Sequence, residues 1–143
     1  MSSGAWKLFI PIEPPTVTHN DLEVRYDRKR RRHFIGKSER LQDAEQAIES
    51  RIRPHAPESP LGGALDARII WCFPTNGAHE QGEPMTDKPD VDNLAKTLFD
   101  CLARCGVIDD DAHIAHEDLT KAWMDPAGIF IEIGRVSYGN GSA

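Results

Sequence analysis

Apolar residues recur along this chain with two different periods, and the changes between these periods predict its elements. Residues 6–11 form a short apolar run that ends in proline, and residues 64–73 alternate in polarity, so both predict strands. Residues 112–123 and 129–133 are further strand candidates. The Asp-Pro-Ala-Gly turn at 125–128 predicts that these last two strands pair as a hairpin.

Two other segments carry apolar residues at helical spacing. Residues 38–53 predict one helix, which Ser38 can cap. Residues 92–105 predict a second helix, and Gly106 suits the position just past its end. The apolar stripe of this second helix consists of Leu94, Leu98, Cys101, Leu102 and Cys105. The alternation of strands and helices predicts an α/β (α+β) fold with a mixed sheet and two main helices.

The connections between these elements fit one domain over residues 1–143. A polar and basic stretch at about 13–37 has no evident period, which predicts a long functional loop or a hairpin. Segments 54–63 and 74–89 are rich in proline and glycine, and we expect them to be surface connections.

Charge is distributed unevenly along the chain. The net charge of −6 by itself argues against a nucleic-acid partner. Between Arg25 and Arg40, however, there are eight basic and two acidic residues, a local net of +6, whereas the nine basic and 21 acidic residues elsewhere give −12. Salt screens exposed charges over about 10 Å, so the local patch decides what binds there. The run from Arg28 to Arg32 is either a phosphate-binding arm or a solvated loop.

Several classes of protein are disfavoured by what the sequence lacks. No apolar run approaches the roughly 20 residues that span a bilayer, and the first residues do not resemble a secretory signal. We therefore expect a cytoplasmic protein without a membrane partner. Cys72, Cys101 and Cys105 form no CxxC pair, which argues against a disulfide framework and a structural zinc site.

The strongest chemical pattern lies around Asp90 and Asp92. Pro89 favours an extended approach to Asp90, and Asp92 then stands at the expected helix start. Helix capping explains Asp92 alone, but it leaves Asp90 and the triplet from Asp109 to Asp111 unexplained. Carboxylate oxygens are the ligands that Mg²⁺ prefers, so a metal site is the alternative interpretation. It requires the chain to bring the triplet back toward Asp90.

Lys96 follows Asp92 by four residues, which places both on one helical face. One interpretation is an ordinary surface ion pair between them, worth roughly a few tenths of a kcal/mol. The other is a cation held near a scissile phosphate, where it stabilises charge that develops in the transition state.

These residues resemble the RusA-type Holliday-junction resolvases, which are crossover junction endodeoxyribonucleases of bacteria and phages. The family's pattern appears here as Asp90-Val91-Asp92-Asn93-Leu94-Ala95-Lys96, Asp100-Cys101-Leu102, Gly106-Val107-Ile108 and Asp110-Asp111-Ala112-His113-Ile114. The resemblance is dense over residues 88–121, and the order of elements extends it along the chain. It departs in the connections at 54–63 and 74–87.

The resemblance implies a function and assigns residues to it. Asp90, Asp92 and Asp111 correspond to catalytic, metal-binding carboxylates, and Lys96 corresponds to an essential catalytic lysine. Three consecutive aspartates leave Asp110 as an alternative to Asp111, although counting from Gly106 favours Asp111. Together with the basic segment, the expected DNA contacts are Arg28, Lys29, Arg30, Arg31, Arg32, Lys88 and Lys121.

The implied enzyme is a homodimer that resolves four-way DNA junctions by paired symmetric nicks in recombination and repair. It hydrolyses the phosphodiester with Mg²⁺, or with Mn²⁺ as a substitute. Two alternatives stay open at this point. One is a non-catalytic relative that binds branched DNA, and the other is a metal-dependent nuclease with a different nucleic-acid substrate.

Overall fold

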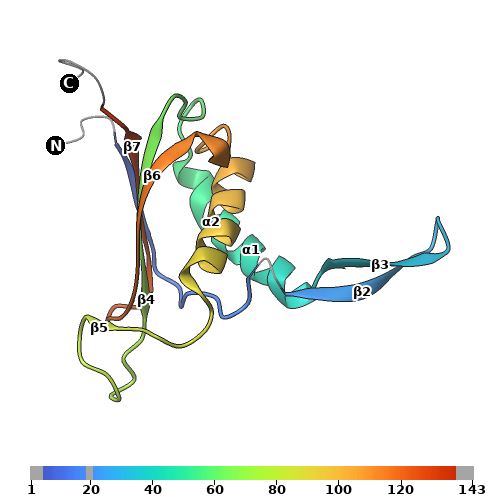
Figure 1. The fold of residues 1–143 in the computed structure, drawn as a ribbon, viewed down its shortest axis with the longest axis horizontal. Helices are drawn as coiled ribbons and strands as arrows, with labels where there is room; N and C mark the ends of the chain where they lie inside the picture. Colours follow the sequence, from blue (N-terminus) through green and yellow to red (C-terminus); the bar gives the residue numbers. More distant parts are fainter. Residues whose placement is uncertain (1–4, 19–20, 138–143) are drawn as a thin grey trace.

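A five-stranded mixed sheet carries two helices on one of its faces in the computed structural model, which describes residues 5–18 and 21–137 (Figure 1). The strands are β1 (Trp6–Ile10), β2 (Leu22–Asp27), β3 (Arg32–Lys37), β4 (Leu65–Phe73), β5 (Glu83–Pro84), β6 (Ile114–Trp123) and β7 (Gly128–Arg135). The helices are α1 (Glu39–Ile52) and α2 (Val91–Arg104), with short 3-10 turns η1 (Arg53–His55) and η2 (Asp111–His113). The predicted fold class, with a mixed sheet and two main helices, is confirmed.

Strand β4 is the centre of the sheet, whose order is β1-β7-β4-β6-β5. It pairs in parallel with β6 and antiparallel with β7. Every second residue from Leu65 to Trp71 is at most 1% exposed, so the alternation in the sequence does mark the face that packs on the helices. Helix α2 connects β4 to its parallel neighbour β6, which is the usual crossover for parallel strands.

The predicted hairpin between the last two strands is wrong. β4 lies between β6 and β7, and β7 pairs with β4 and β1 instead. The physical reason is burial. Most residues of β4 and half of those of β7 are buried, whereas β6 has one buried residue and is bordered on its other side only by the two-residue strand β5. A turn signal at 125–128 therefore did not decide which strands pair.

Each helix begins directly after an N-cap residue with extended backbone, Ser38 for α1 and Asp90 for α2. Ser38 Oγ accepts a hydrogen bond of 3.1 Å from the backbone N–H of Leu41, which confirms Ser38 as the cap of α1. Helix α2 begins at Val91, one residue earlier than predicted, because Asp90 takes the extended conformation of the N-cap position. Gly106 follows α2 with a φ of +77°, in the left-handed region that glycine tolerates. The predicted apolar stripe of α2 is buried throughout.

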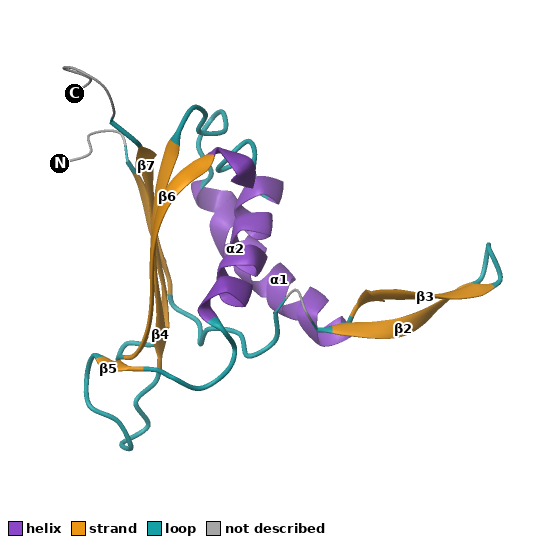
Figure 2. Cartoon of the chain, in the orientation of Figure 1, coloured by secondary structure: helices purple, strands orange, loops and turns teal. Residues whose placement is uncertain are grey.

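The basic stretch forms a hairpin arm, defined here as β2, β3 and the turn between them, that projects from the helical side of the body (Figure 2). Within the described residues, β2 and β3 pair only with each other. Asp27 organises the turn, because its Oδ1 accepts hydrogen bonds from the backbone N–H groups of Lys29 and Arg30. Of the two predictions for this stretch, the hairpin is therefore the correct one.

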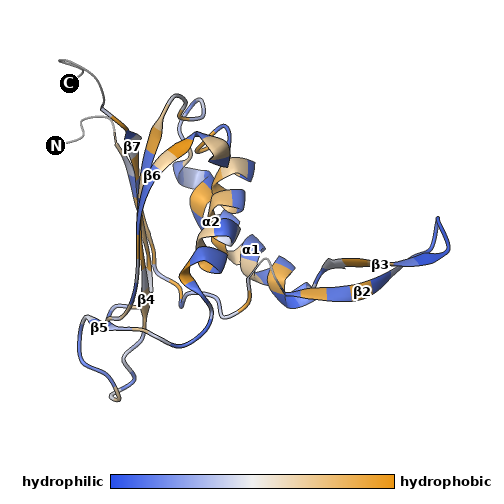
Figure 3. Ribbon diagram, in the orientation of Figure 1, coloured by the Kyte–Doolittle hydropathy of each residue, from blue (hydrophilic) through white to orange (hydrophobic). Residues whose placement is uncertain are grey.

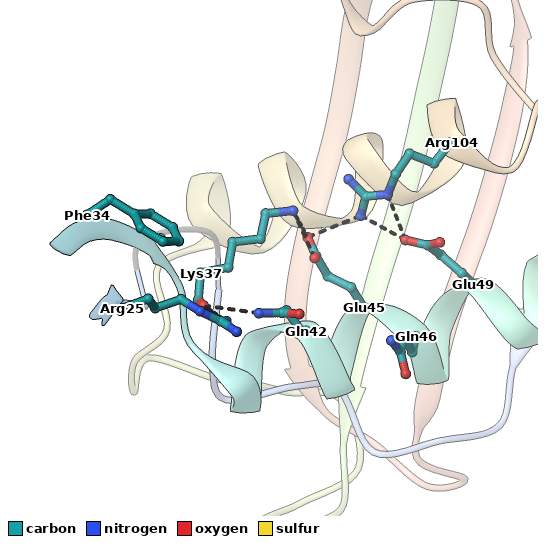
Figure 4. Close-up of a pocket in the computed structure, with 9 residues that line it drawn as sticks. Arg25, Phe34, Lys37, Gln42, Glu45, Gln46, Glu49 and Arg104 are labelled. Carbon is teal, nitrogen blue, oxygen red and sulfur yellow. Dashed lines mark hydrogen bonds and ion pairs between the residues drawn. The ribbon is translucent and has the colours of Figure 1, made fainter. Parts of the chain in front are cut away.

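The root of the arm is tied to both helices by a chain of ion pairs (Figure 4). Lys37 of β3 donates to Glu45 of α1 at 2.9 Å, and Arg104 of α2 contacts the same carboxylate at 3.2 Å. Arg104 also lies 2.7 Å from Glu49, which in turn pairs with Arg53 at 2.9 Å. Glu45 is only 5% exposed, so its charge depends on these partners. This network fixes the arm to the body at its base.

The long connection before α2 is held in place by the turn after β6. Asp125 accepts hydrogen bonds from the backbone N–H of Thr75 and from its hydroxyl, and Gln81 Nε2 donates to the Asp125 carbonyl oxygen. The ring of His79 stacks on Trp123 with 3.9 Å between centroids. All three cysteines are free and buried. No helix within the described residues is long and apolar enough to cross a membrane.

Candidate active site

The N-terminus of α2 presents two of the predicted carboxylates. Asp90 occupies the N-cap position, but its side chain makes no capping hydrogen bond to the helix. Asp92 lies in the first turn, and both residues are exposed. The capping explanation considered for Asp92 is therefore wrong, because the helix has already begun at Val91. Both carboxylates lie where the helix dipole favours negative charge.

The aspartate triplet at 109–111 divides into three separate contacts. Asp109 Oδ1 lies 2.7 Å from Nδ1 of His113, and Asp110 Oδ1 accepts a hydrogen bond of 2.9 Å from the backbone N–H of Ala112. Asp111 instead turns to α2, where its Oδ2 accepts a hydrogen bond of 3.0 Å from Nζ of Lys96. Of the three, Asp111 is the one in contact with the helix that carries Asp92.

Lys96 joins two carboxylates on the exposed side of α2. Its Nζ lies 3.0 Å from Asp111 and 3.2 Å from Asp100, one turn further along the helix. The ion pair between Lys96 and Asp92, one of the two interpretations of their spacing, is not among the salt bridges of Lys96, which pairs with Asp100 and Asp111 instead. The hydrogen bond to Lys96 lowers the pKa of Asp111, and the hydrogen bonds to Asp111 and then Asp100 raise the pKa of Lys96. Both groups are charged at neutral pH.

Lys121 of β6 supports the segment that leads into Asp90. Its Nζ donates to the backbone carbonyl of Asp87 at 2.7 Å and to that of Pro89 at 2.8 Å. Asp90, Asp92, Asp100 and Asp111 form what we call the acidic region. Strand β6 follows the turn that carries Asp111, and its Lys121 contacts Pro89, so the strand runs from one end of this region to the other. Lys88 is exposed on the same segment.

The three predicted metal ligands are not assembled into one cluster. Within residues 5–18 and 21–137, no three His, Cys, Asp or Glu side chains form a group that could hold a metal ion. What the structure brings together is Asp111, Lys96 and Asp100, with Asp92 and Asp90 on the same helix. Asp111 therefore lies against α2, as the metal hypothesis requires. That Asp90, Asp92 and Asp111 together bind a metal ion stays a prediction.

The basic tip and the root of the arm lie apart from this acidic region. All five residues from Arg28 to Arg32 are exposed. A cavity of about 560 Å³ lies at the root, between the arm and the helices, and is lined by Arg25, Phe34, Gly36, Lys37, Gln42, Glu45, Gln46, Glu49 and Arg104 (Figure 4). Its lining includes none of the predicted catalytic residues, so the cavity does not define the active site.

Two features, one at the site and one at the root of the arm, were missed from the sequence. Asp100 is a partner of Lys96, and its spacing of four residues on the helix was a usable signal. Glu45 and Glu49 occur on the buried side of α1, where an acidic residue needs a cationic partner. Their common partner, Arg104, is more than 50 residues away, so no local pattern could identify it.

Comparison with known proteins identifies the family. The profile of the endodeoxyribonuclease RusA family matches residues 14–134, which include the arm, both helices, Asp90 to Lys96 and Asp111. Comparison with curated proteins gives no match. Because the family profile covers most of the 143 residues, with the acidic region and Lys96 inside the match, this chain belongs to the RusA endodeoxyribonuclease family.

Proposed function

We propose that this protein is a divalent-metal-dependent endonuclease that resolves four-way DNA junctions by paired, symmetric nicks, acting as a homodimer. The observation that carries the proposal is the contact between Lys96 on α2 and Asp111 in η2, the turn that leads into β6. It links the Asp90–Lys96 segment to the aspartate triplet in a chain of this family. Two chains related by a two-fold axis suit a substrate whose two cut strands are related in the same way.

The chemistry of the donor set fits a hard divalent cation. Asp90, Asp92 and Asp111 offer only carboxylate oxygens, which suit Mg²⁺ or Mn²⁺. Mg²⁺ commonly binds one or two carboxylates and completes its shell with water and substrate phosphate, so a preassembled three-carboxylate cage is not required. A bound cation supplies a water of lowered pKa and neutralises charge on the phosphate.

The chain's own residues perform the remaining tasks. Asp90 and Asp92 supply negative oxygens at the start of α2, and Asp111 supplies another across from Lys96. Lys96 stays protonated because its pKa is raised, so it can stabilise the charge that develops on the phosphate oxygens. Lys121 holds the backbone before Asp90 and thereby orients that carboxylate.

The basic residues other than Lys96 serve binding rather than the chemical step. Cations attract the DNA backbone without reading its sequence, and we assign this role to the exposed arm turn and Lys88, and to half-buried Lys121 in addition to its contacts with the protein backbone. The assigned contacts are Arg28, Lys29, Arg30, Arg31, Arg32, Lys88 and Lys121. The acidic remainder of the chain keeps DNA away from unrelated surfaces. This activity implies a role in DNA recombination and repair in the bacterial cytoplasm. The enzyme is encoded either by the bacterium or by a phage.

The test compares a synthetic four-way junction with a matching linear duplex, a flap and an RNA duplex, each with Mg²⁺, Mn²⁺ or EDTA. We expect paired nicks in the junction alone, only with metal. Asp90→Asn should bind the junction with unchanged affinity and fail to cut it, whereas the matched change Asp87→Asn, three residues earlier in the loop, should cut normally. Undiminished cleavage by Asp90→Asn would falsify the assignment of that residue.

The remaining outcomes separate the alternatives. Binding of the junction without cleavage under any metal condition identifies a non-catalytic relative. Cleavage of the linear duplex, the flap or the RNA at a similar rate identifies a nuclease of broader substrate range. Either result excludes the resolvase proposal.

A further inference from the structure

Lys96 lies in the middle of a polar stripe on α2. Asp92, Lys96 and Asp100 follow one another at intervals of four residues, so they lie along one side of the helix. Figure 3 shows hydrophilic and hydrophobic bands alternating along α2, whose apolar residues are buried in the core. Lys96 therefore has an acidic residue about one turn away in either direction along the helix.

The partner that Lys96 takes on the helix is not the one that helical geometry favours. Helical side chains tilt toward the N-terminus, and an acidic residue four positions before a lysine makes a better pair than one four positions after it. Lys96 nevertheless pairs with Asp100, at 3.2 Å, rather than with Asp92. The same Nζ also lies 3.0 Å from Asp111, which reaches α2 from η2. The contact with Asp111 therefore outweighs the preference of the isolated helix.

This arrangement distinguishes Asp111 from the other two predicted metal ligands. Asp90 and Asp92 are exposed, and Lys96 pairs with neither of them. The carboxylate of Asp111 already has a cation beside it, because its Oδ2 accepts a hydrogen bond from the Lys96 ammonium group. Lys96 therefore competes for this carboxylate with any divalent ion that binds there.

The two partners of Lys96 are not equivalent. The side chain of Asp111 is 36% exposed and that of Lys96 48%, so water and salt screen their attraction and the pair can open. Asp100 is less exposed, at 28%, and belongs to the same helix as Lys96. Its contact with Lys96 therefore persists when Asp111 turns away, whereas a lysine without any partner rotates freely on its flexible chain.

We propose that Lys96 is the counter-ion of Asp111 before a divalent ion binds, and that it passes to Asp100 once Asp111 becomes a metal ligand. Asp100 is then a positioning residue, which keeps the ammonium group beside the site where it can reach the scissile phosphate. The inference rests on the metal-dependent cleavage in the proposed function and adds Asp100 to the residues that serve it.

The first test measures Mn²⁺ binding to the full chain by electron paramagnetic resonance, without DNA. We expect Lys96→Gln to bind Mn²⁺ about twofold to fivefold more tightly than the wild type, because Asp111 loses its competing cation. Asp100→Asn should bind Mn²⁺ about twofold more weakly, because Lys96 then keeps Asp111 as its one partner. The matched control Asp87→Asn removes an exposed acid from the loop before Asp90 and measures the effect of lost charge alone.

A double variant separates an effect through Lys96 from general electrostatics. If Asp100 acts by holding Lys96, then Asp100→Asn should have no further effect on Mn²⁺ affinity in a chain that already carries Lys96→Gln. If Asp100 contributes only its negative charge, the two substitutions should act additively.

A second test follows the Lys96 side chain directly. Carbon-13 relaxation of the lysine ε-methylene groups reports how firmly each ammonium group is held. With saturating Mg²⁺, the Lys96 group should stay ordered in the wild type and become mobile in Asp100→Asn. Without Mg²⁺ it should be ordered in both, because Asp111 remains its partner. Asp100→Glu, which keeps the carboxylate, should restore the order with Mg²⁺, whereas a purely structural ion pair would give the same loss with and without the ion.

Three outcomes overturn the inference. They are a Mn²⁺ affinity that Lys96→Gln leaves unchanged, additive effects in the double variant, and a Lys96 side chain that stays ordered with Mg²⁺ in Asp100→Asn. A chain that cuts junctions and shows any of these keeps the proposed function and loses this role of Asp100. A chain that binds Mn²⁺ and shows the expected changes but cuts no DNA rejects the proposed function and leaves the exchange of partners by Lys96 standing, so the two proposals fail separately.

Discussion

The body and the arm use the same strand pattern in opposite ways. In β4 of the body, alternate residues from Leu65 to Trp71 are at most 1% exposed. In β2 of the arm, the alternate apolar residues Leu22, Val24 and Tyr26 are more than half exposed. Alternation in a sequence therefore shows that a strand has an apolar face, but another element must be present before that face is buried.

The same contrast appears in the way charges are held. In the body, acidic and basic side chains meet across elements, as Lys96 and Asp111 do at 3.0 Å. In the arm, the run from Arg28 to Arg32 is exposed and has Asp27 as its close acidic neighbour. The proposed function assigns the paired charges of the body to chemistry and the exposed charges of the arm to the binding of a polyanion.

The largest expected effect comes from matched aromatic deletions in the two regions. Trp71→Ala, in the body, should lower the free energy of unfolding by about 3–5 kcal/mol, because Trp71 is 1% exposed and its loss leaves a cavity. Phe34→Ala, in the arm, should lower it by less than about 1 kcal/mol, since Phe34 is 44% exposed. Urea unfolding followed by tryptophan fluorescence and circular dichroism measures both. Equal losses would remove the distinction between a packed body and an exposed arm.

Removing charge from the arm turn should weaken DNA binding without affecting stability. The triple change of Arg30, Arg31 and Arg32 to Ala should reduce junction affinity by about tenfold to a hundredfold and lower the slope of binding against salt by up to about 3. The control removes three exposed arginines from the body, Arg51, Arg68 and Arg135. Fluorescence anisotropy at several salt concentrations measures both variants. If the control flattens the salt dependence as much as the arm variant, the arm is not the main phosphate contact.

Disconnecting the arm from the body should have an intermediate effect. Glu45→Ala should lower the free energy of unfolding by about 1–3 kcal/mol, because it leaves Lys37 without its buried acceptor and removes one of the two carboxylates that pair with Arg104. The side chains of Lys37 and Arg104 are each 40% exposed, so water compensates in part for the lost carboxylate. Hydrogen exchange should speed up over residues 22–37. Asp43→Ala, an exposed acid on the same helix, should stay within about 0.5 kcal/mol of the wild type. Slow exchange in the arm of Glu45→Ala would contradict this role for the ion pairs.

The smallest expected effect concerns the exposed pair of His116 and Asp66, which the strand register of the body brings together. His116 and Asp66 are register partners in β6 and β4, and His116 Nδ1 lies 2.8 Å from Asp66 Oδ1. This hydrogen bond raises the pKa of His116 above 6.5. The stabilisation is therefore present below pH 6.5 and is lost as the pH rises through the higher folded-state pKa. NMR titration of the His116 ring should show this shift, and Asp66→Asn should reverse it. An unchanged midpoint in that variant would exclude Asp66 as the cause.

Local patterns in the sequence predicted the elements well. The cap at Ser38, the stripe of α2 and the buried alternation of β4 all depend on residues within four positions of each other. The chemical candidates were also local, because Asp90, Asp92 and Lys96 lie within seven residues. Their grouping along the sequence, together with the family resemblance, indicated where to look for the site.

Contacts between distant residues were decided by the tertiary structure. The sequence placed the last two strands in one hairpin, but burial put β4 between them. It offered Asp92 as the partner of Lys96, but folding brought Asp111 from 15 residues away. It also could not show that the apolar face of the arm lacks a partner within the described part of the chain. Periodicity reports which side of an element avoids water, whereas strand order and charge pairing depend on how all the elements share one core.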